Sequence, residues 1–142
     1  MLRNLKLVLA YDGAEFHGWQ YQPNMRSVQE CLEQALRRTV RHRVGVTGCS
    51  RTDSGVHAAA YVASFYTSSL VPERGIFRSV GSRLPKDMTL VDLREVPLTF
   101  HATQSALGKL YRYRIHNAHG RPVEQHLQTT LIMCGMPSIS RP

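Results

Sequence analysis

The order in which strand-like and helix-like spacings of apolar residues follow one another along the chain constrains its fold more than any other feature of the sequence. Apolar and polar residues first alternate, as in a strand, and after Ser27 the apolar residues recur at helical spacing. Two strand patterns, a second helix that starts at Pro72 and a last strand follow. The expected strands are residues 4–11, 44–47, 58–66 and 89–96. The sequence therefore predicts an α+β fold built on a ferredoxin-like βαββαβ unit.

The first helix has the clearest boundaries. Ser27 and Glu30 have the spacing of a capping box, and Val28 to Val40 carry one apolar face. The helix ends among four cations, Arg37, Arg38, Arg41 and Arg43, which suit the negative end of a helix dipole. The same guanidinium groups match phosphate oxygens in pairs, so an anionic, phosphate-bearing ligand is a second interpretation of this cluster.

A further strand is expected to begin at Tyr111, and an irregular tail follows it. Residues 124–142 show no clear helical or strand period, and the character of the sequence changes after about Arg121. We therefore expect the ferredoxin-like unit to be followed by one extra strand and an irregular tail.

Charge points to a polyanionic partner. The net charge is +8, and because only three of the 18 lysines and arginines are lysine, fifteen are arginine. Arginine-rich codon usage in a GC-rich genome would give the same composition. No apolar run is long enough to span a bilayer, and residues 1–10 lack a signal-peptide pattern, so we expect a cytoplasmic protein.

The segment from Cys49 to Ala58 is the most informative candidate for chemistry. Asp53 and Gly55 are typical of a turn in which the carboxylate caps nearby backbone N–H groups. Alternatively, Asp53 is a carboxylate held between two strands beside Arg51, which would favour the ionised form that a nucleophile requires. These residues alone leave both interpretations open.

Aromatic residues and histidines give weaker signals. Phe16 and Trp19 either fill the core or shape an RNA-facing rim. Tyr111 belongs to a strand with aromatic residues on one side, or lies buried beside Asp53 and stacks on a base. The histidines at positions 17, 57 and 101 lack ligand spacing, so we expect no metal site.

Several motifs in register resemble one family. They are Tyr11-Asp12-Gly13, Phe16-His17-Gly18-Trp19-Gln20, Ser27-Val28-Gln29, Arg51-Thr52-Asp53-Ser54-Gly55-Val56-His57-Ala58, Leu84-Pro85, Phe100-His101-Ala102 and Tyr111-Arg112-Tyr113. In that order and spacing, residues 4–122 resemble the tRNA pseudouridine synthase A family.

The resemblance implies an activity and a set of site residues. The family isomerises uridine to pseudouridine in the anticodon stem-loop of tRNA, around positions 38 to 40, as a homodimer without a metal or organic cofactor. Asp53 then corresponds to the nucleophile, Tyr111 to the active-site tyrosine, and Arg51 to the arginine that helps to extrude the target nucleotide. We expect the motif residues Thr52, His57 and Arg112 to contact the RNA as well.

The resemblance also implies a division of the chain. Residues 1–110 form the ferredoxin-like N-terminal unit with the catalytic loop, and residues 111–122 start the second catalytic unit. Residues 123–142 are an atypical tail, either frameshifted or truncated. Family members are much longer, so we expect a truncated, inactive form. The sequence departs from the family at Tyr61, where a glutamine is usual.

Two other interpretations compete with an enzyme. The first is a non-catalytic RNA-binding module on a ferredoxin-like fold, and the second is an inactive, poorly folded fragment. The aromatic signature of RNA-recognition motifs is missing from the expected strands, whereas the complete block around Asp53 is present. This contrast favours enzyme ancestry.

Overall fold

The computed structural model of the chain describes residues 1–105, 108–113 and 130–134. Its strands are β1 (Arg3–Tyr11), β2 (Thr47–Gly48), β3 (His57–Thr67), β4 (Met88–Val96), β5 (Lys109–Tyr113) and β6 (Thr130–Cys134). Its helices are α1 (Val28–Val40), α2 (Glu73–Arg83) and the short 3-10 helix η1 (Gly13–Glu15). In this part of the chain, no helix is both long and apolar enough to cross a membrane.

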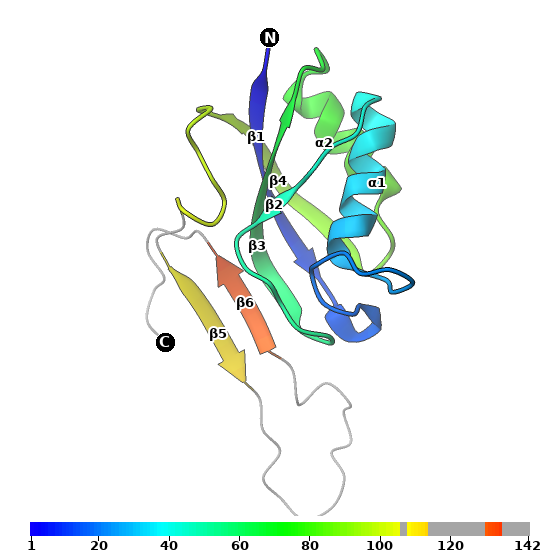
Figure 1. The fold of residues 1–142 in the computed structure, drawn as a ribbon, viewed down its shortest axis with the longest axis vertical. Coiled ribbons are helices and arrows are strands. Elements are labelled where there is room, and N and C mark those ends of the chain that lie inside the picture. Colours follow the sequence, from blue (N-terminus) through cyan, green and yellow to red (C-terminus); the bar gives the residue numbers. More distant parts are fainter. Residues whose placement is uncertain (106–107, 114–129, 135–142) are drawn as a thin grey trace, which may run out of the picture.

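One sheet organises the described part of the chain. The strand order is β4-β1-β3-β6-β5, and β2 also pairs with β3. β1 runs antiparallel to both β3 and β4, and both helices lie on the same side of the sheet (Figure 1). The α+β fold with a ferredoxin-like βαββαβ unit and added strands is thereby confirmed.

The core lies between the sheet and α1. Leu5, Leu7 and Leu9 alternate along β1 and are fully buried, as the period of two predicts. Leu32 and Leu36 are fully buried on the apolar face of α1. α1 begins where the sequence indicates, because the Ser27 hydroxyl accepts a hydrogen bond from the Glu30 backbone N–H at 3.2 Å.

The strand expected at residues 44–47 is wrong in its position. β2 is formed by Thr47 and Gly48. The Val46 N–H donates to the Glu33 carboxylate at 2.9 Å, and the Val46 carbonyl accepts from the Gln29 amide at 3.2 Å. These two bonds hold the residue before β2 against α1.

The segment expected to be an irregular tail contains β6. This strand runs parallel to β3 beside His57–Ala60 and antiparallel to β5, which it separates from β3. β2 occupies the same edge of β3 further along, at Ala63 and Ser64. The two strands thus share one edge of β3 (Figure 1). Residues 114–129 and 135–142, with most of the expected 111–122 unit, lie outside the described residues.

Residues 97–105 cover the sheet face that the helices leave open. The Asn4 side-chain amide donates to the carbonyls of Pro97 and Phe100, at 3.0 and 2.9 Å. The Lys6 ammonium lies 5.9 Å from the centre of the Phe100 ring. This segment brings Thr103 to β2, where its hydroxyl donates to the Gly48 carbonyl at 2.8 Å.

Candidate active site

The loop that carries Asp53 (residues 49–56, the Asp53 loop) is fastened to the loop that joins β1 to α1 (residues 12–27, the aromatic loop). The Trp19 backbone N–H donates to the Thr52 carbonyl, and the Gly55 N–H donates to the Phe16 carbonyl, each at 3.2 Å. The Gly13 N–H donates to Nδ1 of His57 at 2.9 Å. These bonds fix the backbone on both sides of Asp53.

Two glycines allow the loops to approach so closely. Gly18 has a φ of +84°, and a Cβ at this position would lie 2.4 Å from the Thr52 carbonyl oxygen. A Cβ on Gly13 would lie 1.9 Å from the Val56 carbonyl oxygen. Only glycine fits at these two positions without displacing the backbone of the Asp53 loop.

Buried aromatic rings lie beneath the loop. Trp19 stacks on Tyr61 with 4.4 Å between ring centres, and the Tyr61 hydroxyl donates to the Ser50 carbonyl. Phe16 and Trp19 are almost fully buried, so they belong to the core. Tyr61, noted above only as a departure from the family, thus supports the start of the loop.

Burial also sets the protonation of these phenols. Burial raises the pKa of Tyr11 to about 12, and it raises the pKa of Tyr61 further, with smaller contributions from the phenols of Tyr11 and Tyr111. Both buried hydroxyls are therefore protonated at neutral pH and available as hydrogen-bond donors.

The Asp53 side chain is exposed although its backbone is fixed. The Asp53 carbonyl accepts from the Val56 N–H at 3.3 Å, which closes a tight turn. Within the described residues, however, no hydrogen bond or ion pair engages the Asp53 carboxylate. The turn expected from the sequence is present, but the carboxylate does not cap it. The side chain is left available for another role.

Arg51 lies on the same loop, and it does not form an ion pair with Asp53 in the part of the chain that the structure describes. Arg51 instead lines a groove of about 670 Å³ beside the loop. Trp19, Gly48 and Thr103 line the same groove, so it joins the aromatic loop, β2 and the segment after Pro97.

Tyr111 lies at the same end of the sheet as Asp53. In the sheet register, Tyr111 pairs with Ile132, and Ile132 pairs with Ala58 at the start of β3. Tyr111 is therefore two strands, or about 10 Å, from the end of the Asp53 loop. Of the two interpretations of Tyr111, the buried one is wrong, because 45% of its surface is exposed, and the strand is confirmed. β5 is an edge strand, and no further strand covers it among the described residues.

Thr52 and His57 connect the Asp53 loop to β1 and to the residues that follow it. Thr52 is buried, and its hydroxyl lies 3.3 Å from the Tyr11 hydroxyl. Nδ1 of His57 accepts the Gly13 N–H and lies 3.1 Å from a carboxylate oxygen of Asp12. Arg112 is in β5, and its side chain lies outside the described residues.

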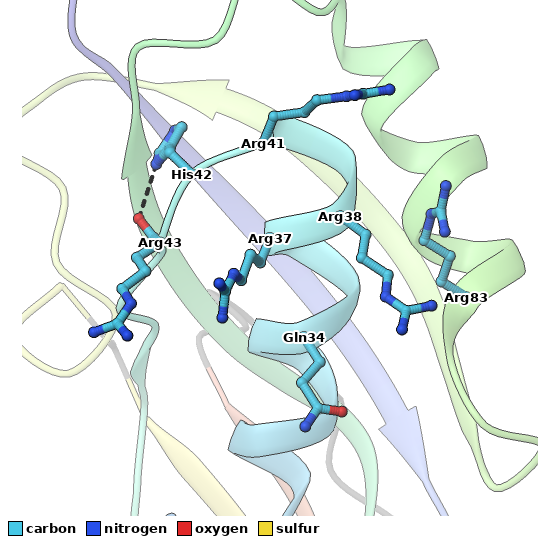
Figure 2. A pocket seen from close by; sticks show the side chains of 7 residues that line it. All are labelled: Gln34, Arg37, Arg38, Arg41, His42, Arg43 and Arg83. Atoms are coloured by element: carbon cyan, nitrogen blue, oxygen red, sulfur yellow. Dashed lines mark hydrogen bonds between the residues drawn. The ribbon is translucent and has the colours of Figure 1, made fainter.

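The four arginines at the end of α1 are distant from Asp53. The backbone N–H groups of Val28 and Gln29 donate to the carbonyls of Gly18 and Trp19, so α1 starts at the aromatic loop, which is itself bound to the Asp53 loop. With 13 residues and about 1.5 Å per residue, α1 is about 20 Å long. The arginines lie at its other end, around a groove that α2 completes (Figure 2).

Sequence reasoning missed the ion pair between Arg26 and Asp87. The guanidinium donates to both carboxylate oxygens, at 2.8 and 2.9 Å, and lies 4.0 Å from the centre of the Phe16 ring. The hydrogen bond from Arg26 lowers the pKa of Asp87. The pair fastens the aromatic loop to the turn before β4, and no sequence signal links residues so far apart.

In the part of the chain that the structure describes, no three histidine, cysteine, aspartate or glutamate side chains lie close enough together to hold a metal ion.

Comparison with known proteins identifies relatives of this loop and its fold. The model of the tRNA pseudouridine synthase family matches residues 7–103. A protein of Ruminiclostridium cellulolyticum named tRNA pseudouridine synthase A is 46% identical over 117 residues, which are 82% of this chain and 48% of that protein. tRNA pseudouridine synthase A 2 of Clostridium perfringens is 42% identical over 121 residues, or 85% of this chain and 50% of that protein. The chain spans about half the length of the curated relatives it matches.

Proposed function

Because the chain belongs to the tRNA pseudouridine synthase family, we propose that it carries the catalytic loop of an isomerase that converts uridine to pseudouridine in tRNA. The target in this proposal is the anticodon stem-loop. The observation that carries it is Asp53, an exposed carboxylate without a hydrogen-bond partner among the described residues, on a backbone that is fixed from both sides. A side chain with no structural task at such a position is suited to react with a substrate.

The reaction explains why a carboxylate is needed. The bond between C1′ of the ribose and N1 of uracil breaks, the uracil turns, and a bond between C1′ and C5 forms. The proton on C5 is lost and N1 gains one, so that product and substrate are isomers. Asp53 is the proposed nucleophile, and attack at C1′ or at C6 of the base would both use its ionised form.

Arg51 and Tyr111 are the proposed partners of Asp53. The target nucleotide must leave the RNA stack, which costs a few kcal/mol. In the proposal, the exposed guanidinium of Arg51 fills the space that the nucleotide vacates. Tyr111 offers a half-exposed ring at the same end of the sheet, suited to stack on the uracil.

The remaining expected site residues divide into two groups. Thr52 and His57 are positioning residues in this proposal. The Thr52 hydroxyl contacts the Tyr11 hydroxyl, and Nδ1 of His57 accepts a hydrogen bond from the Gly13 backbone N–H. Arg112 and the four arginines at the end of α1 are proposed to bind RNA phosphates.

No cofactor enters the proposal, because an isomerisation transfers no electrons to or from an external partner and needs no co-substrate. The proposed assembly is a homodimer, and the proposed compartment is the cytoplasm.

The test replaces Asp53 with Asn, which keeps the size of the side chain and removes its charge. The assay is tritium release from C5-labelled tRNA, by this chain joined to the part of the R. cellulolyticum relative that the similarity does not cover. We expect the rate to fall about 1,000-fold or more. Asp92→Asn removes a carboxylate whose ion pair among the described residues is with Arg94 of the same strand, and it should leave the rate unchanged. Near-normal release by the Asp53→Asn variant would exclude Asp53 as the nucleophile.

A further inference from the structure

The groove at the end of α1 has an unusually cationic lining. Its walls are Gln34, Arg37, Arg38, Arg41, His42, Arg43 and Arg83, and its volume is about 770 Å³. The side chains come from α1, from the turn that follows it and from α2 (Figure 2). Four of the arginines are close in sequence. The fifth, Arg83, is brought beside them by the packing of α2 against α1, so the sequence alone does not show that it belongs to the groove.

These five arginines have no carboxylate partner among the described residues. Arg3, Arg26 and Arg94 each form an ion pair, with Glu95, Asp87 and Asp92. Arg51, Arg74 and Arg78 also lack a carboxylate partner among the described residues, so what distinguishes the groove is that five such cations gather in it. The negative end of the α1 dipole accounts for cations in its last turn, Arg37 and Arg38. It does not account for Arg43 beyond the helix or for Arg83 on α2. Their mutual repulsion would be relieved by an anionic ligand.

We propose that this groove binds the phosphate backbone of an RNA double helix, at about one helix length from the residue that performs the chemistry. The inference rests on the proposed function, because it takes the ligand to be the same RNA that reaches Asp53. It adds to that function a second contact, on a part of the RNA that is not modified.

The lining favours a double helix over a single strand. Sites for single-stranded RNA combine cations with aromatic rings on which the bases stack. The lining contains five guanidinium groups, one imidazole and one amide, but no phenylalanine, tyrosine or tryptophan. Double-stranded RNA hides its bases and is held through its phosphates and its shape, which guanidinium groups without a stacking surface can do.

A second hollow continues the groove along α1, towards the end of the helix that lies near the Asp53 loop. It shares Gln34, Arg38 and Arg83 with the groove and extends to Arg26 and Pro85. Arg26 covers Phe16, whose carbonyl accepts the Gly55 N–H in the Asp53 loop. A rigid RNA stem about 20 Å long can therefore span from the groove to this loop.

The experiment compares two double variants with the same loss of charge. Arg38→Gln with Arg83→Gln removes one guanidinium of the groove from each helix. Arg74→Gln with Arg78→Gln removes two exposed guanidinium groups of α2 that do not line it. Fluorescence anisotropy with the 142-residue chain measures the affinity for a blunt RNA duplex and for one of its single strands, from low to high salt.

We expect the groove variant to bind the duplex about 10-fold more weakly, with a salt slope lower by roughly 2. Its affinity for the single strand should change less than 3-fold, and the Arg74 and Arg78 variant should bind both as the wild type does. An unchanged salt slope on the duplex, an equal loss on both RNAs, or no duplex binding by the wild type would overturn the inference. None of these results bears on the tritium assay for Asp53, so the two proposals can fail separately.

Discussion

Gly18 shows how tightly the residues around Asp53 are packed. Gly18→Ala would place a methyl group 2.4 Å from the Thr52 carbonyl oxygen and force a left-handed φ on alanine. We expect this change to lower the free energy of unfolding by about 2 kcal/mol or more. Urea denaturation measures it, with Gly81→Ala as the control. Gly81 lies in α2 with open space around it, and alanine there should raise stability by about 0.5–1 kcal/mol. Equal effects of the two variants would contradict this account.

At the residue scale, the sequence predicts which residues form the candidate site better than it predicts their burial and contacts. The block around Asp53 identifies the loop, and the order of turn residues predicts its tight turn. The exposure of Tyr111 could not be predicted in this way, because it depends on β5 lying at the edge of the sheet. The hydrogen bond from the Tyr61 hydroxyl to the Ser50 carbonyl could not be predicted either, since it depends on how Trp19 packs on Tyr61.

The Arg26–Asp87 pair makes a prediction at the scale of elements, because it joins the aromatic loop to β4. Asp87 has a pKa below its ordinary value of about 3.9, so the pair stabilises the fold above that pH. The contribution is lost as the pH falls through the lowered pKa of the folded state. We expect Asp87→Asn to reduce stability by about 1 kcal/mol at neutral pH, and the difference from the wild type to vanish in strong acid.

Urea denaturation at several pH values checks this prediction. Asp92→Asn is the matched control, because Asp92 pairs with an exposed arginine of its own strand and should contribute almost nothing. If the effect of Asp87→Asn were the same at every pH, charge would not be its cause.

Elements whose ends are marked by nearby residues, such as a helix cap, could be predicted from the sequence. Strands whose bounds depend on pairing with distant strands could not. α1 begins at Val28 because Ser27 caps it, and both the cap and the apolar face can be read from the sequence. β2 is shorter than expected, and the residue before it, Val46, is held by Glu33 and Gln29 of α1. β6 contains Leu131-Ile132-Met133, a continuous apolar run without alternation. Such a run has no alternation, so it gives no period from which a strand could be predicted.

At the scale of the whole molecule, α1 separates the Asp53 loop from the arginine-lined groove. Its first N–H groups bind the loop beside Asp53, and its last turn carries cations into the groove shared with α2. The rigid helix fixes the distance between them. The arginines that could attract RNA are thus kept away from the carboxylate, where they would have competed for an ion pair.

The last prediction concerns the activity of the 142 residues by themselves. A nucleophilic carboxylate is most effective in a preorganised site from which water is excluded. Here the Asp53 side chain is exposed, and so is nearly half of Tyr111. β5 also lies at an edge of the sheet, where one row of backbone groups is open to a further strand. We therefore expect the 142-residue chain to bind RNA but to form no pseudouridine, whereas the same chain joined to the rest of a relative is active. Single-turnover modification of a tRNA transcript by both proteins measures the difference. Product formation by the 142 residues at the rate of the joined protein would show that the site needs no further wall.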